Sequence, residues 1–403
     1  MTPKTFMLIA GEASGDLLAS ELVVALRGQW PEARFIGAGG PKMVAAGVRL
    51  AFDLTQHSVI GISDVLKNLS EYRRLFNQLL ALAVKQKPDA VIGVDYGGFN
   101  LRFGHAVKKA ARRYRPEWNP RIIQFVSPQV WASRPGRAKQ LAKDYDLLLS
   151  IFPFEKDWYA RRAPRLRVEF VGHPMIGRYT VEDLQLSFRQ ADDGSTANAA
   201  EPAAVPPETA GVVARQNALL LPGSREGELA RHLPVMLDAL KLMQARLPDL
   251  QANMVLPNVS LVRQAKSFDP TGRLKIQAGS LAHALAQADV AIASTGTVTM
   301  ECAFFGVPAV TLYKTSWLNY QIAKRIVTVK SLSMPNLLAG ETVYPEFVQG
   351  DATPANIARA AVDLLQNDAR RAQIKQRLAE IVKTLGEPGA PKRAAEAISS
   401  LFP

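Results

Sequence analysis

Short, continuous apolar runs recur along this 403-residue chain, and helical patterns separate them. Unbroken apolar runs are typical of strands that are buried on both faces, as in a parallel sheet covered by helices. We predict one series of strands at 5–10, 34–37, 90–95, 121–126 and 147–151. A second series follows at 217–221, 252–256, 274–278, 290–293 and 309–313. The sequence therefore predicts an α/β protein with two parallel sheets.

A low-complexity segment separates the two series. Residues 190–215 are rich in Ala, Pro, Ser and Thr and hold few large apolar side chains, which is typical of a linker or insertion. We accordingly expect a first domain at 1–186, a linker or insertion at 187–216, and a second domain at 217–350. Amphipathic helices at 351–403 are expected to pack back on the first domain or on a partner subunit.

Charge and composition narrow the possible partners. The net charge is +13, and residues 101–170 alone hold 16 Lys and Arg against 6 Asp and Glu. Such an excess fits an anionic membrane face, an anionic substrate or simply a solvated surface. Nucleic acid is disfavoured because no recognised binding motif accompanies the charge. The chain shows no signal peptide and no apolar run of transmembrane length, and its single cysteine, Cys302, fits a reducing compartment, so we expect a cytoplasmic protein.

Candidate site residues of the first series follow its buried strands. The turn GEASGD (11–16) directly follows the strand at 5–10, and its glycines and helix start suit a negative group. Asp95 ends the run AVIGVD beside Gly97 and Gly98, where a carboxylate can take a proton from an attacking hydroxyl. Ligands bind beyond the carboxyl ends of strands in such sheets. The alternative is that both acidic turns only cap helices or brace loops.

The second series carries two candidate anion sites. Gly223 and Ser224 can offer backbone N–H groups, and Arg225 can bind a phosphate through two donors. Residues Ser294, Thr295, Gly296 and Thr297 open a helix that carries Glu301, a carboxylate placed to accept bonds from ribose hydroxyls. Two anion sites followed by an acid favour a nucleotide-sugar diphosphate, although each turn alone is also explained by capping.

An apolar segment near residue 60 has two interpretations. Basic residues stand among its apolar side chains, which suits a surface that dips into a bilayer, and a buried helix is the alternative. The patch comprises Val59, Ile60, Ile62, Val65, Leu66 and Leu69. No His, Cys or carboxylate cluster has metal-ligand spacing, so we expect no metal and no cofactor. The absence of GxxxxGK[ST] and GxSxG motifs disfavours ATP hydrolysis and serine-hydrolase chemistry.

Taken together, the motifs resemble the lipid-A-disaccharide synthase family, glycosyltransferase family 19. The resemblance covers most of the chain in order and includes GEASGD (11–16), GVDYGGFN (93–100), SPQVWA (127–132), FVGHPM (170–175), LLPGSREGEL (220–229), the stretch at 294–310 and MPNLLAG (334–340). It implies the GT-B fold, in which two Rossmann-like domains carry parallel sheets that face a central cleft. It also implies an inverting transfer from UDP-2,3-diacylglucosamine to 2,3-diacylglucosamine 1-phosphate, giving a β-1,6-linked disaccharide 1-phosphate and UDP.

The resemblance assigns roles to the candidate residues. Asp95 is expected to be the base, the 223–225 and 294–297 turns to bind the diphosphate, and Glu301 to hold the ribose. Glu12, Ser14 and Asn336 are expected to position the acceptor or support the cleft. The lipid substrates imply peripheral association with the inner face of the inner membrane, and a homodimer with exchanged C-terminal elements is compatible with the family. Another UDP-sugar transferase, a UDP-sugar epimerase and a nucleotide-sensing module without catalysis are the alternatives.

Overall fold

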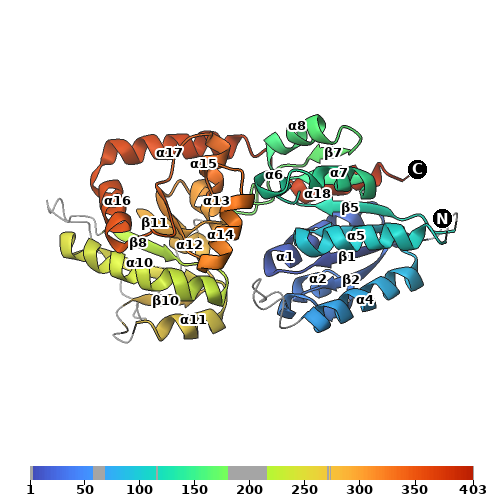
Figure 1. The fold of residues 1–403 in the computed structure, drawn as a ribbon, viewed down its shortest axis with the longest axis horizontal. Coiled ribbons are helices and arrows are strands. Elements are labelled where there is room, and N and C mark those ends of the chain that lie inside the picture. Colours follow the sequence, from blue (N-terminus) through green and yellow to red (C-terminus); the bar gives the residue numbers. More distant parts are fainter. Residues whose placement is uncertain are drawn as a thin grey trace, which may run out of the picture. The chain divides into compact units, whose positions relative to one another are not determined.

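The chain forms two compact α/β units, shown in the computed structural model of Figure 1. The structure describes residues 3–57, 69–114, 117–179, 216–269, 272 and 274–402. Unit 1 comprises Met1–Arg178, Ile326–Thr328 and Thr384–Pro403, and unit 2 comprises Tyr179–Arg325 and Val329–Lys383. Each unit is built around its own parallel sheet, as the two series of apolar runs predict.

In the described residues of unit 1, seven parallel strands pair in the order β3-β2-β1-β4-β5-β6-β7. The strands are β1 Thr5–Ala10, β2 Arg34–Gly39, β3 Arg49–Asp53, β4 Ala90–Val94, β5 Arg121–Phe125, β6 Leu147–Ser150 and β7 Val168–Phe170. The helices are α1 Ala13–Gln29, α2 Pro41–Ala45, α4 Leu69–Gln86, α5 Gly97–Ala111, α6 Val130–Ser133, α7 Arg137–Asp144, α8 Pro153–Arg162 and α18 Ala390–Ser399, with a 3₁₀ turn at Thr55–His57.

Helices cover both faces of this sheet, which explains why its central strand is apolar throughout. Met7 and Ile9 of β1 join the core beneath α4 and α5. The ring of Phe6 points to the opposite face, where it contacts the rings of Trp30 and Phe402. Helix α18 lies beside α1 on that face (Figure 1). All six residues of β1 are consequently buried, as expected for a strand covered on both faces.

In the described residues of unit 2, six parallel strands pair in the order β10-β9-β8-β11-β12-β13. The strands are β8 Asn217–Leu221, β9 Gln251–Leu256, β10 Lys275–Ala278, β11 Val290–Ser294, β12 Ala309–Tyr313 and β13 Glu346–Val348. The helices are α10 Glu226–Arg246, α11 Val259–Lys266, α12 Leu281–Ala286, α13 Thr297–Phe304, α14 Trp317–Ile326, α15 Met334–Ala339, α16 Pro354–Gln366 and α17 Asp368–Lys383.

The C-terminal helices are divided between the units, whereas the sequence suggested that 351–403 returns as one block. Helix α16 packs on α10 and β11, and its Ile357, Leu364 and Leu365 are part of the core of unit 2. Helix α17 follows it into that core, and only Thr384–Pro403 belongs to unit 1. The apolar face of α16 is needed to cover the second sheet, which fixes its place. The expected linker at 187–216 lies outside the described residues except for Gln216.

The predicted strands are confirmed within one or two residues at each end. Three strands were missed, namely β3, β7 and β13, and all lie at or beside an edge of a sheet. Their residues are partly exposed, so they lack the unbroken apolar run that marks the central strands. Both sheets and their parallel order nevertheless follow from the pattern of apolar runs.

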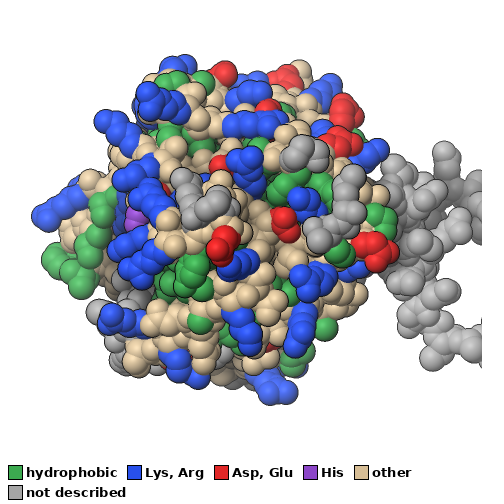
Figure 2. All heavy atoms as spheres, turned by 90° about the vertical axis from the view of Figure 1, so that its right-hand side faces the viewer, with side chains coloured by type: hydrophobic (Ala, Val, Ile, Leu, Met, Phe, Trp, Pro, Cys, Tyr) green, Lys and Arg blue, Asp and Glu red, His purple; other side chains and the backbone are tan. Residues whose placement is uncertain are grey.

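Unit 1 carries a basic surface over α5, α6 and α7. Figure 2 shows more Lys and Arg than Asp and Glu on the face that carries the chain termini. Burial lowers the pKa of the Arg137 guanidinium, and the positive charges of Arg134 and Arg102 lower it further. These three side chains therefore share a region of positive potential. Among the described residues, no helix combines the length and the apolar character needed to cross a membrane.

Most of the apolar patch predicted near residue 60 lies outside the described residues, which resume at position 69. This applies to Val59, Ile60, Ile62, Val65 and Leu66. Leu69 is the first residue of α4, and its side chain is not described. Membrane contact through this patch therefore stays a prediction.

Candidate active site

The strand order of unit 1 reverses between β1 and β4, and the candidate base lies at this reversal. From β1 the chain continues to β2 and β3 on one side, whereas from β4 it continues to β5 and β6 on the other. In open parallel sheets, ligands bind at such a switch point, beyond the carboxyl ends of the strands. Ala10 of β1 pairs in register with Val94 of β4, so Gly11 and Asp95 leave the sheet side by side.

Two buried amide side chains fix the backbone of Asp95. Asn100 Nδ2 and Gln124 Nε2 each donate a hydrogen bond to the Asp95 carbonyl oxygen at 2.8 Å. The Asp95 N–H donates to the carbonyl oxygen of Phe125 at 2.9 Å. Gly93 provides the space for the amides, since a Cβ at that position would lie 2.5 Å from Gln124 Oε1. The backbone of the half-buried Asp95 is therefore held from β5 and α5 while its side chain leaves the end of β4.

Asp95 and Tyr96 both adopt the left-handed conformation, with φ of 50° and 46°. Non-glycine residues in this region cost about 1 kcal/mol or more each, so neighbouring contacts must hold them there. The ring of Tyr96 occupies the space above Gly11, where a Cβ would lie 2.3 Å from a ring carbon. Burial and a hydrogen bond with Tyr96 raise the pKa of Tyr72 well above its usual range. The missing side chain of Gly11 thus leaves room for the Tyr96 ring, and the hydrogen bond with Tyr72 holds that ring in place.

The GEASGD turn lies beside Asp95, but its residues have different roles. Glu12 is the N-cap of α1 and is half-buried, whereas Ser14 is exposed in the first helical turn. A Cβ on Gly15 would lie 3.8 Å from the Asp95 Cβ, which places this first turn next to the candidate base. Asp16 is buried and accepts hydrogen bonds from the backbone N–H groups of residues 40, 42 and 43, so it caps α2. For Asp16, the structural role of a helix cap, given above as the alternative to ligand binding, therefore applies.

Unit 2 repeats this arrangement at its own switch point, between β8 and β11. Leu221 of β8 pairs in register with Ala293 of β11, so the turns at 222–225 and 294–297 lie side by side at one edge. Gly223 has φ of 124°, and a Cβ there would lie 3.4 Å from Ser294 Oγ. The structure therefore brings together the two anion sites predicted separately from the sequence.

A carboxylate missed by the sequence analysis occupies the first of these turns. Glu228 Oε2 accepts a hydrogen bond from the Ser224 backbone N–H at 3.2 Å. Its Oε1 pairs with Arg225 Nη1 at 3.0 Å, and both side chains are partly exposed. An internal anion is thus bound by the donors that were predicted to bind a phosphate. The spacing of Arg225 and Glu228 on one helical turn was the available signal.

The second turn presents backbone groups and hydroxyls at the start of α13. Ser294 is buried, Thr295 is half-buried, and Gly296 and Thr297 are exposed. Gly296 is the N-cap with φ of 151°, and its carbonyl oxygen accepts bonds from the backbone and side chain of Thr299. Glu301 is half-buried one turn into the helix. The sequence selected this residue only by its spacing from the 294–297 turn.

His232 links this edge of the sheet to a third strand, although no sequence pattern marks it as a functional residue. His232 Nδ1 donates to the carbonyl oxygen of Pro222 at 2.7 Å, and its Nε2 accepts from the Lys314 N–H at 3.0 Å. An imidazole that accepts from the Lys314 N–H is neutral with its proton on Nδ1, whereas the 3.2 Å approach of Nε2 to the Lys314 carbonyl oxygen needs a proton on Nε2. Burial lowers the pKa of His232, which favours the neutral imidazole. The ring therefore joins the ends of β8 and β12.

Asn336 braces a turn of its own. Its Nδ2 donates to the carbonyl oxygen of Tyr344 at 2.9 Å, and its Oδ1 accepts from the N–H groups of Val343 and Tyr344. The residue is buried. These bonds fix the turn between α15 and β13, so any effect of Asn336 on substrate would pass through that turn.

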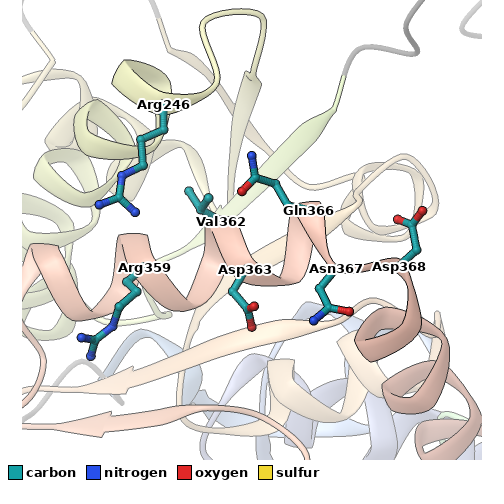
Figure 3. Close-up of a pocket in the computed structure, with 7 residues that line it drawn as sticks. All are labelled: Arg246, Arg359, Val362, Asp363, Gln366, Asn367 and Asp368. Carbon is teal, nitrogen blue, oxygen red and sulfur yellow. The ribbon is translucent and has the colours of Figure 1, made fainter.

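An open hollow of about 530 Å³ in the described part of the chain lies away from both switch points. Figure 3 shows it over α16 and the end of α10, lined by Arg246, Arg359, Val362, Asp363, Gln366, Asn367 and Asp368. Helix α10 starts beyond the carboxyl end of β8 and ends at Arg246, just before the amino end of β9. The hollow therefore lies at the amino edge of the sheet, where the switch-point rule predicts no ligand.

No three His, Cys, Asp or Glu side chains of the described residues gather in an arrangement that could hold a metal ion. The groups of the unit 2 switch point that can bind an anion are Arg225 and the turn N–H groups, which Glu228 shares, and the hydroxyls of 294–297. Backbone N–H groups at a helix start and a guanidinium both bind diphosphates.

Solved structures show the same architecture and define the class. A kitacinnamycin glycosyltransferase matches with a TM-score of 0.59 at 18% identity, over 100% of both chains. A Staphylococcus aureus MnaA–UDP structure matches with a TM-score of 0.59 at 12% identity, over 99% of this chain and 96% of that one. The chain thus has the GT-B fold of glycosyltransferases and UDP-sugar epimerases.

Sequence comparison narrows this class to one family. The family model described as lipid-A-disaccharide synthetase matches residues 6–401. The lipid-A-disaccharide synthase of Myxococcus xanthus is 34% identical over 100% of this chain and 98% of its own length. That of Trichlorobacter lovleyi is 35% identical over 99% and 98%. The chain belongs to the lipid-A-disaccharide synthase family of glycosyltransferases, and the resemblance stated from its motifs is confirmed.

Proposed function

We propose that this chain joins two acylated glucosamines in lipid A biosynthesis. The donor is UDP-2,3-diacylglucosamine, the acceptor is 2,3-diacylglucosamine 1-phosphate, and the products are the β-1,6-linked disaccharide 1-phosphate and UDP. Membership of the family supports the reaction. One observation supports assigning the acceptor to unit 1 and the donor to unit 2. The switch point of unit 1 holds the acid Asp95, and that of unit 2 holds the anion-binding turns.

In this proposal the switch point of unit 2 binds the donor. Arg225, the N–H groups of 223–224 and the groups of 294–297 bind the diphosphate, and Glu301 accepts bonds from the ribose hydroxyls. As the bond between the anomeric carbon and the diphosphate oxygen breaks, negative charge grows on the diphosphate. A guanidinium and oriented N–H groups stabilise that charge more than they stabilise the intact donor, and this difference lowers the barrier.

The switch point of unit 1 supplies the base. The Asp95 carboxylate takes the proton from the 6-hydroxyl of the acceptor as that oxygen attacks the anomeric carbon. A new C–O bond forms on the face opposite the leaving UDP, so the configuration inverts. Glu12 and Ser14, in the turn beside Asp95, are proposed to position the acceptor.

The acyl chains place both substrates in a membrane, so we propose that the protein works as a peripheral protein on the inner face of the inner membrane. The basic surface around Arg102, Arg134 and Arg137 supports contact with anionic lipid headgroups. The apolar segment at 59–69 is proposed to dip into the bilayer.

A direct assay tests the proposal. The purified protein is incubated with both diacylated substrates in detergent, and the products are separated by mass spectrometry. Formation of disaccharide 1-phosphate and an equal amount of UDP is expected. Epimerised UDP-sugar formed from a water-soluble donor without acceptor would support the epimerase alternative, and UDP binding without any product would support a sensing module.

A further inference from the structure

Helix α14 of unit 2 exposes an unusual amount of apolar surface. Trp317 is 73% exposed, Leu318 is 62% exposed and Ile322 is 48% exposed. None of the described residues of this ten-residue helix is buried. At 100° per residue, these three side chains lie within one broad face, together with Arg325. The side of the helix turned toward solvent is therefore its apolar side.

Other exposed apolar residues of the described chain do not gather in this way. Val24, Val44, Leu242 and Val259 stand singly on four different helices. Single exposed apolar side chains are ordinary and need no partner. Three of them on one short helix are a candidate contact surface.

The charged residues of α14 and of the chain segments next to it in sequence are all positive. Lys324 and Arg325 are exposed in its last turn. From Cys302 to Gly340 the chain contains no Asp or Glu. Exposed Trp, Leu and Ile flanked by Lys and Arg form the pattern of a helix that lies in the headgroup region of an anionic bilayer.

The position of α14 connects it with the proposed donor site. The helix follows β12, whose Leu312 pairs with Ser294 of β11, so it begins at the edge that carries the anion-binding turns. Lys314, just before the helix, is bonded through His232 to the carbonyl oxygen of Pro222. The apolar helix and the diphosphate turns are therefore held on one edge of unit 2.

We infer that α14 is a membrane-docking helix, which inserts Trp317, Leu318 and Ile322 into an anionic phospholipid surface while Lys324 and Arg325 contact lipid phosphates. A helix of ten residues is only about 15 Å long, so its exposed face is far smaller than the roughly 800 Å² per partner of a stable protein interface. A bilayer needs no such minimum area, and it is where acylated substrates reside. The inference rests on the proposed function, which supplies those substrates.

Vesicle binding of matched variants tests the docking helix. Leu318→Glu is compared with Leu242→Glu, which makes the same change at an exposed position of α10 in the same unit. With vesicles of phosphatidylglycerol and phosphatidylcholine, Leu318→Glu is expected to weaken binding about tenfold or more, because the substitution puts a charge where the exposed Leu318 side chain would enter the bilayer. Leu242→Glu is expected to bind like the unaltered chain. Equal binding by Leu318→Glu and the unaltered chain would overturn the inference.

Trp317 offers a second readout that does not depend on binding strength. Acyl chains brominated near the headgroup quench only indoles that enter the bilayer. Of the other four tryptophans, Trp118 and Trp131 are buried in unit 1 and Trp30 and Trp158 are half-buried there, so the comparison with Trp317→Phe assigns the quenching. Quenching in the unaltered chain and its loss in Trp317→Phe, with binding retained, are expected. This holds even where the 59–69 segment contributes binding of its own. Quenching that persists unchanged in Trp317→Phe rejects insertion of α14.

Two controls separate the remaining outcomes. Sedimentation velocity shows whether Leu318→Glu alters self-association, and a change there with unaltered vesicle binding assigns α14 to a second copy and overturns the inference. Turnover of detergent-dispersed substrates by the unaltered chain tests the proposed function alone. Turnover without vesicle binding through α14 refutes the docking helix, whereas quenching of Trp317 without turnover refutes the proposed function.

Discussion

Gln124 Nε2 donates to the carbonyl oxygen of Asp95 at 2.8 Å, across the pair of strands β4 and β5. Asn100 Nδ2 donates to the same oxygen from α5 at the same distance. Two buried amides on one carbonyl oxygen hold a residue whose φ of 50° is unfavourable for a side chain other than glycine. The position of the Asp95 carboxylate at the end of β4 is thus fixed by hydrogen bonds to its own backbone.

Replacing Asp95 by Asn should remove most of the transfer activity. Asn has the same shape and tolerates the left-handed conformation, so folding should be unchanged while the base is lost. A positioned base contributes about 10²- to 10⁴-fold to rate. Steady-state kinetics with both lipid substrates measure kcat, and Asp53→Asn, at the end of β3 in the same sheet, is the control. Near-normal turnover by Asp95→Asn would falsify the assignment of the base.

Replacing Gln124 by Leu should lower kcat without abolishing turnover. The Asp95 carbonyl oxygen keeps its bond from Asn100 but loses one of two buried donors, which costs about 1–3 kcal/mol of stability. The carboxylate then populates more orientations, so kcat is expected to fall about tenfold while UDP binding to unit 2 is retained. Thermal unfolding, kcat and UDP affinity are measured together. Loss of UDP affinity in parallel with kcat would indicate general damage to the fold.

Arg225 and Glu228 should have opposite effects on UDP binding. Arg225→Ala removes the guanidinium and should weaken UDP about tenfold or more, since bonds to charged groups contribute about 1.5–3 kcal/mol. Glu228→Gln removes the internal anion that occupies the Ser224 N–H and the guanidinium, and should tighten UDP. Isothermal titration calorimetry measures both, with Arg231→Ala of the same helix as control. Weaker UDP binding by Glu228→Gln would mean that Glu228 holds the turn in its binding form.

Glu155 should make the folded state less stable as pH rises. Burial raises the pKa of this carboxyl to about 7, although Trp131 Nε1 donates to it at 2.9 Å. Between pH 4.5 and 7 the folded chain therefore binds a proton at Glu155 that the unfolded chain has released, and the contribution of Glu155 to stability falls by about 3 kcal/mol across this window. Glu155→Gln should remove this contribution, so the variant should gain stability relative to the unaltered chain as pH rises from 4.5 to 7 when urea unfolding is followed at several pH values. The same pH profile in both proteins would contradict the raised pKa of Glu155.

His173 should act in the opposite direction over an overlapping window. Burial and, to a smaller extent, the positive charge of Arg178 lower its pKa to about 4. Between pH 4 and 6.5 the unfolded chain binds the extra proton, so this contribution to stability grows as pH rises. The two groups oppose each other from pH 4.5 to 6.5 in the unaltered chain. His173→Gln should therefore unmask the decline due to Glu155. A flat profile for that variant would contradict the shift of Glu155, and a profile identical to that of the unaltered chain would contradict the shift of His173.

The sequence predicted the central strands and both switch-point turns because the four strands at the switch points read as apolar runs that stop at Gly11, Asp95, Pro222 and Ser294. Asp95 and the turns at 223–225 and 294–297 could be selected in this way. Glu228 and His232 could not, because their importance depends on partners that only folding brings close, Ser224 and the backbone of Pro222 and Lys314. Gln124 lies within β5, and the sequence alone does not show that its side chain donates to the Asp95 carbonyl oxygen of the neighbouring strand.

The ring of Phe402 packs against Phe6 and Trp30, so the most N-terminal strand of unit 1 is completed by residues near the other end of the chain. A ribosome making this protein has synthesised all of unit 2 before α18 emerges. Until then one face of β1 and α1 remains open to water, and to any chaperone that recognises apolar surface. The first unit to be translated is therefore among the last to reach its final form, and a premature stop late in the message damages the beginning of the protein.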